Sequence, residues 1–219
     1  MNVTLNEVEA RVLGCLIEKE MTTPEYYPLS LNALTNACNQ KSNRDPVMAL
    51  AEEDVVRALN RMRFNQLTVV SGESSRVAKY RHLLAENLQL VPAELAVISE
   101  LLVRGPQTVG ELRTRCERMH AFVDLAEVED VLKELIERKD PLVVRMPRQP
   151  GRKEARNAHL FSGLPDMTVE EQGAAPEAAR VRVQAGDERV TKLEEEVAGL
   201  REEVAGLRQL VEEFKKQFE

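Results

Sequence analysis

The sequence predicts a mainly α-helical chain with small β-hairpins, built as two tandem winged-helix domains, a linker and a C-terminal coiled-coil helix. Two observations carry this prediction. A helix followed by a hairpin occurs at 50–84 and returns at 124–161, and apolar residues recur with heptad spacing from 187 onward. A winged helix is a set of three helices followed by a hairpin, the wing. The predicted boundaries are 1–85 and 86–163 for the two domains, 164–186 for a flexible linker and 187–219 for the coiled coil.

The third helix of each domain is predicted from apolar residues that share one face at the 3.6-residue period. These residues are Val55, Val56, Leu59 and Met62 in the first domain, and Val128, Val131, Leu132, Leu135 and Ile136 in the second. After each helix the pattern changes to β-branched or alternating residues, which predict a hairpin. The predicted strands are 67–71 and 77–81 in the first domain, and 142–146 and 156–161 in the second.

The helices in front of this unit repeat as well. Ser30, Leu34 and Cys38 match Thr108, Leu112 and Cys116 at a constant offset of 78, and Glu9–Leu13 matches Glu94–Ile98 at an offset of 85. The difference of seven residues indicates an insertion in the first copy, around 22–29. Each copy is therefore expected to hold three helices and a hairpin in the same order.

Capping residues mark where these helices begin. Ser30 and Thr108 are predicted N-caps, because their hydroxyl oxygens can accept a hydrogen bond from an unpaired helix N–H group. Thr108 with Glu111, and Thr4 with Glu7, have the spacing of a capping box. We expect the first helix over about 6–20, with Val8, Val12 and Leu16 inward, and the second over 31–38.

Composition favours a binding protein over an enzyme. The chain has no glycine-rich phosphate loop after a strand and no Gly-x-Ser-x-Gly motif. Its three cysteines, Cys15, Cys38 and Cys116, have the phase of small buried residues, with a redox or metal role as the alternative. Its three histidines are too scattered for a zinc site. We therefore expect no catalytic residues, no metal and no cofactor.

The charge is unevenly distributed. Residues 1–85 hold 10 basic and 10 acidic side chains, whereas residues 164–219 hold 8 and 14 and account for most of the net charge of −7. The start of the chain has neither a basic nor an apolar signal stretch, and no apolar run approaches the ~20 residues of a membrane span. These features predict a cytoplasmic protein whose front part is close to neutral.

DNA is the partner that the predicted fold favours. In winged helices the third helix enters the major groove and the wing reaches the DNA backbone. Basic residues occur in the turn before the first third helix, on that helix, and in both wings, where they suit phosphate contact. The candidate nucleic-acid-binding residues are Lys41, Arg44, Arg57, Arg61, Arg76, Lys79, Arg145, Arg148, Arg152, Lys153 and Arg156.

Acidic residues at the start of both third helices favour a protein partner instead. The helices begin with Glu52-Glu53-Asp54 and with Glu127-Val-Glu-Asp130, and acids there would repel phosphates. Arg57 has the spacing to pair with Glu53 as an ordinary surface ion pair. The alternative function is therefore a protein–protein adaptor without DNA binding. Tyr26 and Tyr27 would be its contact residues, unless they pack within the domain.

Four segments resemble the YceH family of bacterial proteins. They read TTPEYYPLSLN at 22–32, ACNQKSNRDPVM at 37–48, RGPQTVGELR at 104–113 and FSG at 161–163. The resemblance covers about 1–163. It implies tandem winged helices, in agreement with the pattern of the residues, and it provides no catalytic or binding residues.

The last segment has the spacing of a coiled coil. Valine at heptad position a with leucine at d favours a parallel dimer, and a fold-back helix or a higher oligomer is the alternative. The predicted dimer interface consists of Val190, Leu193, Val197, Leu200, Val204, Leu207, Val211 and Phe214.

A truncation after Gly163 tests this homodimer. The shortened chain lacks every predicted heptad residue, so we expect it to be monomeric while the full chain is dimeric. Light scattering on both purified proteins measures the mass per particle. The same number of chains per particle in both would refute pairing through 187–219.

Overall fold

The computed structural model describes residues 4–71, 77–148 and 154–165, which together form a mixed α/β structure of helices and small antiparallel sheets. All of them lie in one compact unit, Met1–Val169. The elements of the first half are α1 Glu7–Thr22, the 3₁₀ turn η1 Pro24–Tyr26, β1 Leu29–Ser30, α2 Leu31–Cys38, α3 Glu52–Phe64, β2 Thr68–Ser71 and β3 Lys79–His82. After α4 (Leu84–Leu88), the second half holds α5 Pro92–Arg104, α6 Val109–Arg115, α7 Leu125–Glu137, β4 Val143–Arg145 and β5 Asn157–His159.

The strands form two small sheets. In the first half the order is β1-β3-β2, with both pairings antiparallel and Leu29 opposite Tyr80. In the second half β4 pairs with β5, and Val143 lies opposite His159. A single bridge between Gln107 and Asn157 takes the place of β1, with both backbone hydrogen bonds formed, at 3.0 and 2.7 Å. Gln107 lies 78 residues after Leu29, so this bridge follows the repeat found in the sequence.

Most predicted helix starts are confirmed, and one is corrected. Ser30 accepts a hydrogen bond from the Ala33 N–H group, and Thr108 and Glu111 form the predicted capping box. The first helix, however, is capped by Asn6 with Glu9, through two hydrogen bonds of 2.9 Å. Thr4 lies two residues before this cap, and the buried Leu5 between them is outside the helix. The elements η1, β1 and α4 were not predicted; each is five residues or fewer, too short for a periodic signal.

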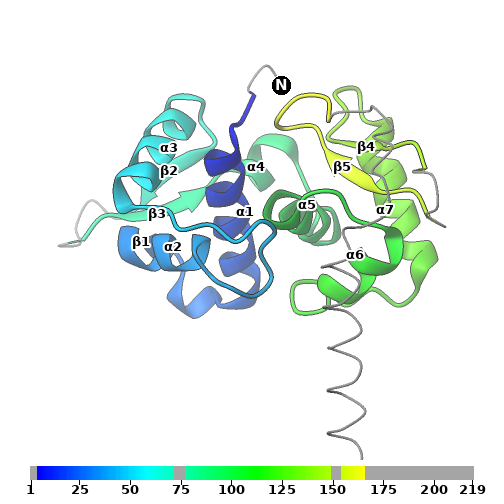
Figure 1. The fold of residues 1–219 in the computed structure, drawn as a ribbon, viewed down its shortest axis with the longest axis horizontal. Coiled ribbons are helices and arrows are strands. Elements are labelled where there is room, and N and C mark those ends of the chain that lie inside the picture. Colours follow the sequence, from blue (N-terminus) through cyan, green and yellow to red (C-terminus); the bar gives the residue numbers. More distant parts are fainter. Residues whose placement is uncertain (1–3, 72–76, 149–153, 166–219) are drawn as a thin grey trace, which may run out of the picture. The chain divides into compact units, whose positions relative to one another are not determined.

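The two halves share one continuous hydrophobic core. Figure 1 shows α1 and α5 side by side, with α2 and α3 beyond α1 and with α6 and α7 beyond α5. Burial is unbroken over Glu9–Glu18 of α1 and over Glu94–Val103 of α5. Helices buried on all sides are core helices. The sequence predicted only one inward face for α1, because the contact with α5 depends on residues about 85 positions away.

The α1–α5 contact depends on a glycine. A Cβ atom at Gly14 would lie 2.7 Å from Val103 Cγ1 and 2.9 Å from Leu102 Cβ, which is closer than real Cβ atoms come. The small residue also leaves the Gly14 carbonyl open to the hydroxyl of Ser99, which donates to it at 3.1 Å. Gly14 therefore sets the distance between the two central helices.

Gly14→Ala tests this constraint. The added methyl group must push α5 away or displace Val103, so we expect a loss of about 1–3 kcal/mol in the free energy of unfolding. Gly110→Ala is the matched control, because Gly110 lies in α6 and a Cβ there would meet nothing within 4 Å. Since alanine is the better helix former, the control should be neutral or slightly stabilising. Urea denaturation of both variants measures the difference, and equal stabilities would contradict the close approach.

Candidate nucleic-acid interface

Helix α3 is held by its apolar face and by its first turn. Val55, Ala58, Leu59 and Met62 are buried and face the core that α1 and α2 share with it. At the start of the helix, the Asp54 carboxylate accepts a hydrogen bond from the Ala51 N–H group at 3.0 Å. The opposite face is thereby fixed toward solvent.

The exposed face of α3 carries Arg57, Asn60, Arg61 and Phe64, at the i, i+3, i+4 and i+7 positions. The Arg57 side chain is 75% exposed and pairs with Asp54, not with Glu53 as its spacing had indicated. Arg61 is 56% exposed, and its Nε lies 3.3 Å from the buried Glu9 carboxylate. Phe64 is 88% exposed. This face therefore offers planar cations, an amide and an aromatic ring in one row.

The β2–β3 hairpin and the turn after α2 contribute fewer exposed cations than predicted. Lys79 lies exposed in β3, and Arg76 lies outside the described residues. Lys41 is exposed in the turn after α2 and has no hydrogen bond or ion pair within the described part of the chain. Of the predicted cations of this half that are described, Lys41, Lys79, Arg57 and Arg61 reach solvent.

Arg44 does not belong to this surface. Its side chain is fully buried and donates two hydrogen bonds to the Glu18 carboxylate, at 3.2 and 2.5 Å, and a third to the Ala37 carbonyl at 3.1 Å. Burial raises the pKa of Glu18, but the hydrogen bonds and charge of Arg44 outweigh it, so this pKa lies below its ordinary value. Because the guanidinium is engaged inside the protein, we remove Arg44 from the candidate interface.

The basic residues of the second hairpin are not equivalent. Arg148 is exposed, and Arg145 is exposed at 3.6 Å from Glu129. Arg156, by contrast, donates to the Pro106 carbonyl at 2.6 Å and lies 3.0 Å from Glu111. It ties β5 to the start of α6. Arg152 and Lys153, at the hairpin tip, lie outside the described residues.

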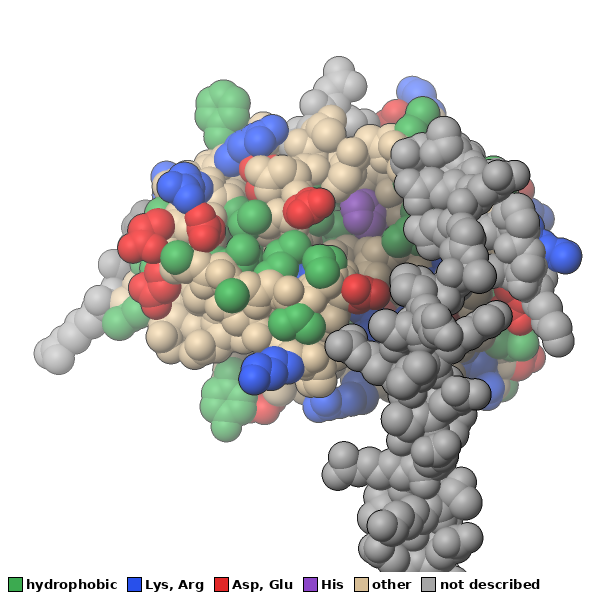
Figure 2. Space-filling view, viewed as in Figure 1, with side chains coloured by type: hydrophobic (Ala, Val, Ile, Leu, Met, Phe, Trp, Pro, Cys, Tyr) green, Lys and Arg blue, Asp and Glu red, His purple; other side chains and the backbone are tan. Residues whose placement is uncertain are grey.

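Helix α7 is acidic, whereas the acids in the first turn of α3 are balanced by its three arginines. Its exposed residues include Glu129, Asp130, Glu134 and Glu137, against Lys133 alone. In Figure 2, acidic and basic side chains are interspersed over the face that is shown, without one large field of either sign. The second half therefore repeats the order of elements without repeating the surface of its third helix.

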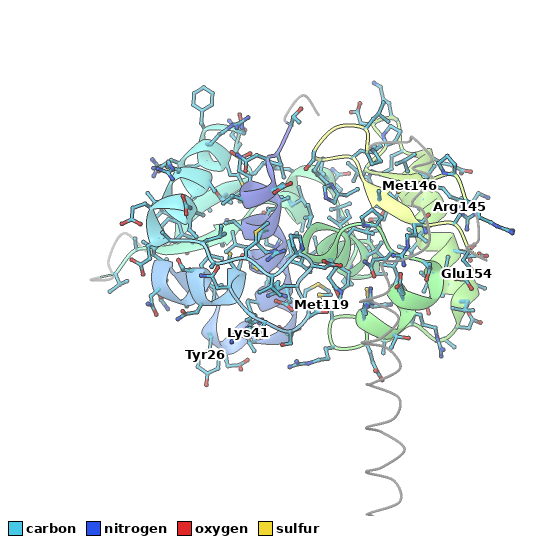
Figure 3. All side chains as sticks on the ribbon, in the orientation of Figure 1. Tyr26, Lys41, Met119, Arg145, Met146 and Glu154 are labelled. Carbon is cyan, nitrogen blue, oxygen red and sulfur yellow. The ribbon has the colours of Figure 1, made fainter. Side chains whose placement is uncertain are left out.

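The two tyrosines of the inserted loop have different roles. Tyr27 is partly buried, and its hydroxyl oxygen accepts a hydrogen bond from the His82 N–H group at 2.9 Å. Burial raises the pKa of this phenol. Tyr26 is 72% exposed and projects away from the body of the protein (Figure 3). Tyr27 therefore packs within the fold, whereas Tyr26 remains exposed and could contact a partner protein.

The three cysteines, Cys15, Cys38 and Cys116, are free and buried, as expected of small core residues. Among residues 4–71, 77–148 and 154–165, no cluster of His, Cys, Asp or Glu is placed to hold a metal, and no helix could cross a membrane. The predicted dimer residues from Val190 to Phe214 lie outside the described residues.

Several cations that reach the surface were not predicted as site residues. Arg63, next to Phe64 on α3, is exposed, and no other described residue pairs with its side chain. Lys19, Arg115 and Arg118 line a cleft together with Lys41. A helical-wheel view of α3 could have found Arg63. The cleft residues come from positions almost 100 apart and are brought together only by the fold.

One buried acid lies behind this cleft. Glu100 is fully buried; its Oε2 accepts a hydrogen bond from Asn43 at 3.5 Å, while its Oε1 has no hydrogen-bond partner among the described residues. Burial raises the pKa of Glu100 to about 7. Asn43 also accepts a hydrogen bond from Arg104 at 3.0 Å, so its amide links the two halves.

Comparison with known proteins gives relatives over the whole chain. A family model described as "Protein of unknown function, DUF480" matches residues 5–152. Similar proteins named UPF0502 protein occur in Geotalea daltonii, Geotalea uraniireducens and Geobacter metallireducens, at 69%, 66% and 64% identity over 219 residues. Each alignment covers 100% of both chains. These names describe neither a ligand nor a reaction.

The Glu100 carboxyl makes stability depend on pH. Its pKa is about 7 in the folded state against 4.5 for an ordinary glutamate side chain, so the folded protein holds the proton more tightly. Stability should therefore fall as pH rises from about 4.5 to above 7. Glu100→Gln removes this loss, and we expect the variant to gain on the order of 3 kcal/mol over the natural chain at about pH 8, with little change at about pH 5.

Denaturant unfolding at both pH values measures this effect. Glu134→Gln on the exposed face of α7 is the control, because Glu134 has no partner among the described residues and should change stability little at either pH. A Glu100→Gln variant that gains no stability at alkaline pH would contradict a protonated buried acid.

Proposed function

The chain belongs to the DUF480 family, and from its own residues we propose that it is a DNA-binding protein of regulatory type, built from two tandem winged-helix units. The observation that carries the proposal is the exposed row Arg57, Asn60 and Arg61 on α3, beside a hairpin in the sheet order β1-β3-β2. In winged helices the helix next to the hairpin enters the major groove. The role is one of binding, and we propose no catalytic residues.

The exposed side chains on α3 are of the types that contact DNA bases. Arginine and asparagine make paired hydrogen bonds with the edges of guanine and adenine, and an exposed aromatic ring can contact the thymine methyl group. Arg63 and Lys79 are available for phosphates. Because Glu52, Glu53 and Asp54 occupy the first turn, the middle and end of α3 would face the bases. The surface pair of Arg57 with Asp54 costs little to exchange, about 0–1 kcal/mol.

The second unit would contact DNA differently. The exposed acids of α7 would repel phosphates, so its contact would come from the hairpin, through Arg145, Arg148, Arg152 and Lys153. A homodimer formed by 187–219 would bring two such chains to one duplex. Two copies double the number of phosphate contacts, which favours tight and salt-dependent binding.

A protein–protein adaptor is the second candidate function. Two observations favour it: the exposed acidic face of α7, and Tyr26, a ring on the surface of a short loop. Tyrosine is frequent among the residues that dominate binding energy at interfaces. The acidic face would suit a partner with a basic surface. This role requires no affinity for DNA, which is how the two functions are told apart.

Fluorescence anisotropy with a labelled random-sequence duplex tests the DNA-binding function. We expect salt-sensitive binding by the full chain. In Arg63→Ala/Lys79→Ala the slope of log affinity against log salt should fall by about 0.9 for each phosphate that the variant no longer neutralises. Lys133→Ala/Lys139→Ala removes two exposed cations at and after α7 and should keep the slope. Absence of binding at low salt would favour the adaptor, and equal changes in both variants would refute the assignment to α3 and the β2–β3 hairpin.

A further inference from the structure

A second site lies where the two halves meet, and we propose that it binds a phosphorylated small molecule. This junction cleft has a volume of about 740 Å³, within the range of small-molecule sites. Its lining includes Lys19, Gln40 and Lys41 from the first half, and Arg115, Arg118 and Met119 from the second. The proposal is independent of DNA binding.

Three segments build the junction cleft. They are the end of α1, the turn that follows α2, and the end of α6 with the turn after it. The turn after α2 is held rigidly, because Asn43, with a positive φ of 54°, contacts Glu18 at 3.3 Å, Glu100 at 3.5 Å and Arg104 at 3.0 Å. The lining side chains therefore project from a backbone that is fixed before any ligand arrives.

The junction cleft has free cations. Lys41 and Arg118 are exposed, and no hydrogen bond or ion pair engages their side chains within the described residues. Lys41 lies near Met119 in Figure 3, and both line the cleft. Because the two cations come from opposite halves, a ligand held by both must lie between them.

Further hydrogen-bond donors surround these two cations. Lys19 is shared between Glu18 at 3.3 Å and the Gln40 side-chain oxygen at 3.4 Å, and Arg115 lies 3.5 Å from Glu111. The oxygen of Gln40 is thus occupied, and its NH₂ group remains a donor. Glu18 is neutralised by the buried Arg44, at 2.5 Å. The electrostatic potential in the cleft should therefore be positive.

This donor-rich lining selects for a ligand rich in acceptors. A phosphate group carries several charged oxygens and is recognised by lysine, by arginine and by amide N–H groups. The cleft is too large for one phosphate alone. Among the described residues that line it, Met119 is the one apolar side chain, and Glu117 is a carboxylate with no cationic partner. They suit an organic part with a small apolar surface and a hydroxyl or amino donor.

Isothermal titration calorimetry of the full chain with inorganic pyrophosphate tests the junction cleft. We expect saturable binding of one pyrophosphate per chain that weakens at higher ionic strength. Lys41→Ala/Arg118→Ala should weaken it about tenfold or more. Neither side chain is engaged by another described residue, so the variant should fold. Lys133→Ala/Lys139→Ala, which removes the same charge away from the cleft, should bind as the natural chain does.

Each other outcome would overturn the proposal. Absence of saturable heat would show that the cleft holds no phosphate group. Equal weakening in both double variants would make the effect one of net charge. If citrate, an anion without phosphate, binds as tightly as pyrophosphate, the cleft does not select for phosphate groups and the proposal is refuted. A short DNA duplex that competes with pyrophosphate would assign the cleft to phosphodiester groups and refute a small-molecule ligand.

Discussion

The close approach of α1 and α5 at Gly14 is the constraint on which the rest of the structure depends. With Val103 2.7 Å from where a Cβ would lie, the two helices contact each other almost backbone to backbone, and the cores on either side merge into one. A chain built from two repeated units therefore behaves as one body in this region. The relative placement of α3, α7 and both hairpins follows from that contact, and so does the junction cleft. Residues of both halves line one cleft because this central contact brings the two halves together.

Buried arginines complete the junction. Arg11 donates to three carbonyl groups, those of Cys38 at 3.2 Å, Pro46 at 2.7 Å and Val103 at 3.3 Å, so one guanidinium links α2, the following turn and α5. Arg44 joins the same turn to Glu18 on α1. A buried charge without partners is costly, so each of these contacts is needed once the side chain is inside. The turn after α2 is thus held by ionic and polar contacts from several directions. That is why Lys41 and Asn43 occupy defined positions beside the cleft.

The periodicity of the sequence predicted the features that depend on neighbouring residues and missed the contacts between residues far apart in the chain. The faces of α3 and α7, the caps at Ser30 and Thr108 and the two hairpins follow from residues a few positions apart, and these predictions are confirmed. Arg44 was placed on the surface because nothing in its neighbourhood reveals Glu18, which lies 26 residues earlier. The unbroken burial of α1 was missed for the same reason, since α5 comes much later in the chain. Of the candidate site, the exposed cations of α3 could be predicted, whereas the junction cleft required the fold.

The two halves repeat the same fold but differ in the surface of their third helices. Both halves have the same order of three helices and a hairpin, and even the short strand β1 has its counterpart in the Gln107–Asn157 bridge. Yet the exposed face of α3 carries arginine and asparagine, while that of α7 carries glutamate and aspartate. One architecture therefore presents exposed arginines on the third helix of one half and mainly exposed acids on the third helix of the other. Function in this chain must be assigned from individual side chains, because the shared fold would give both halves the same role.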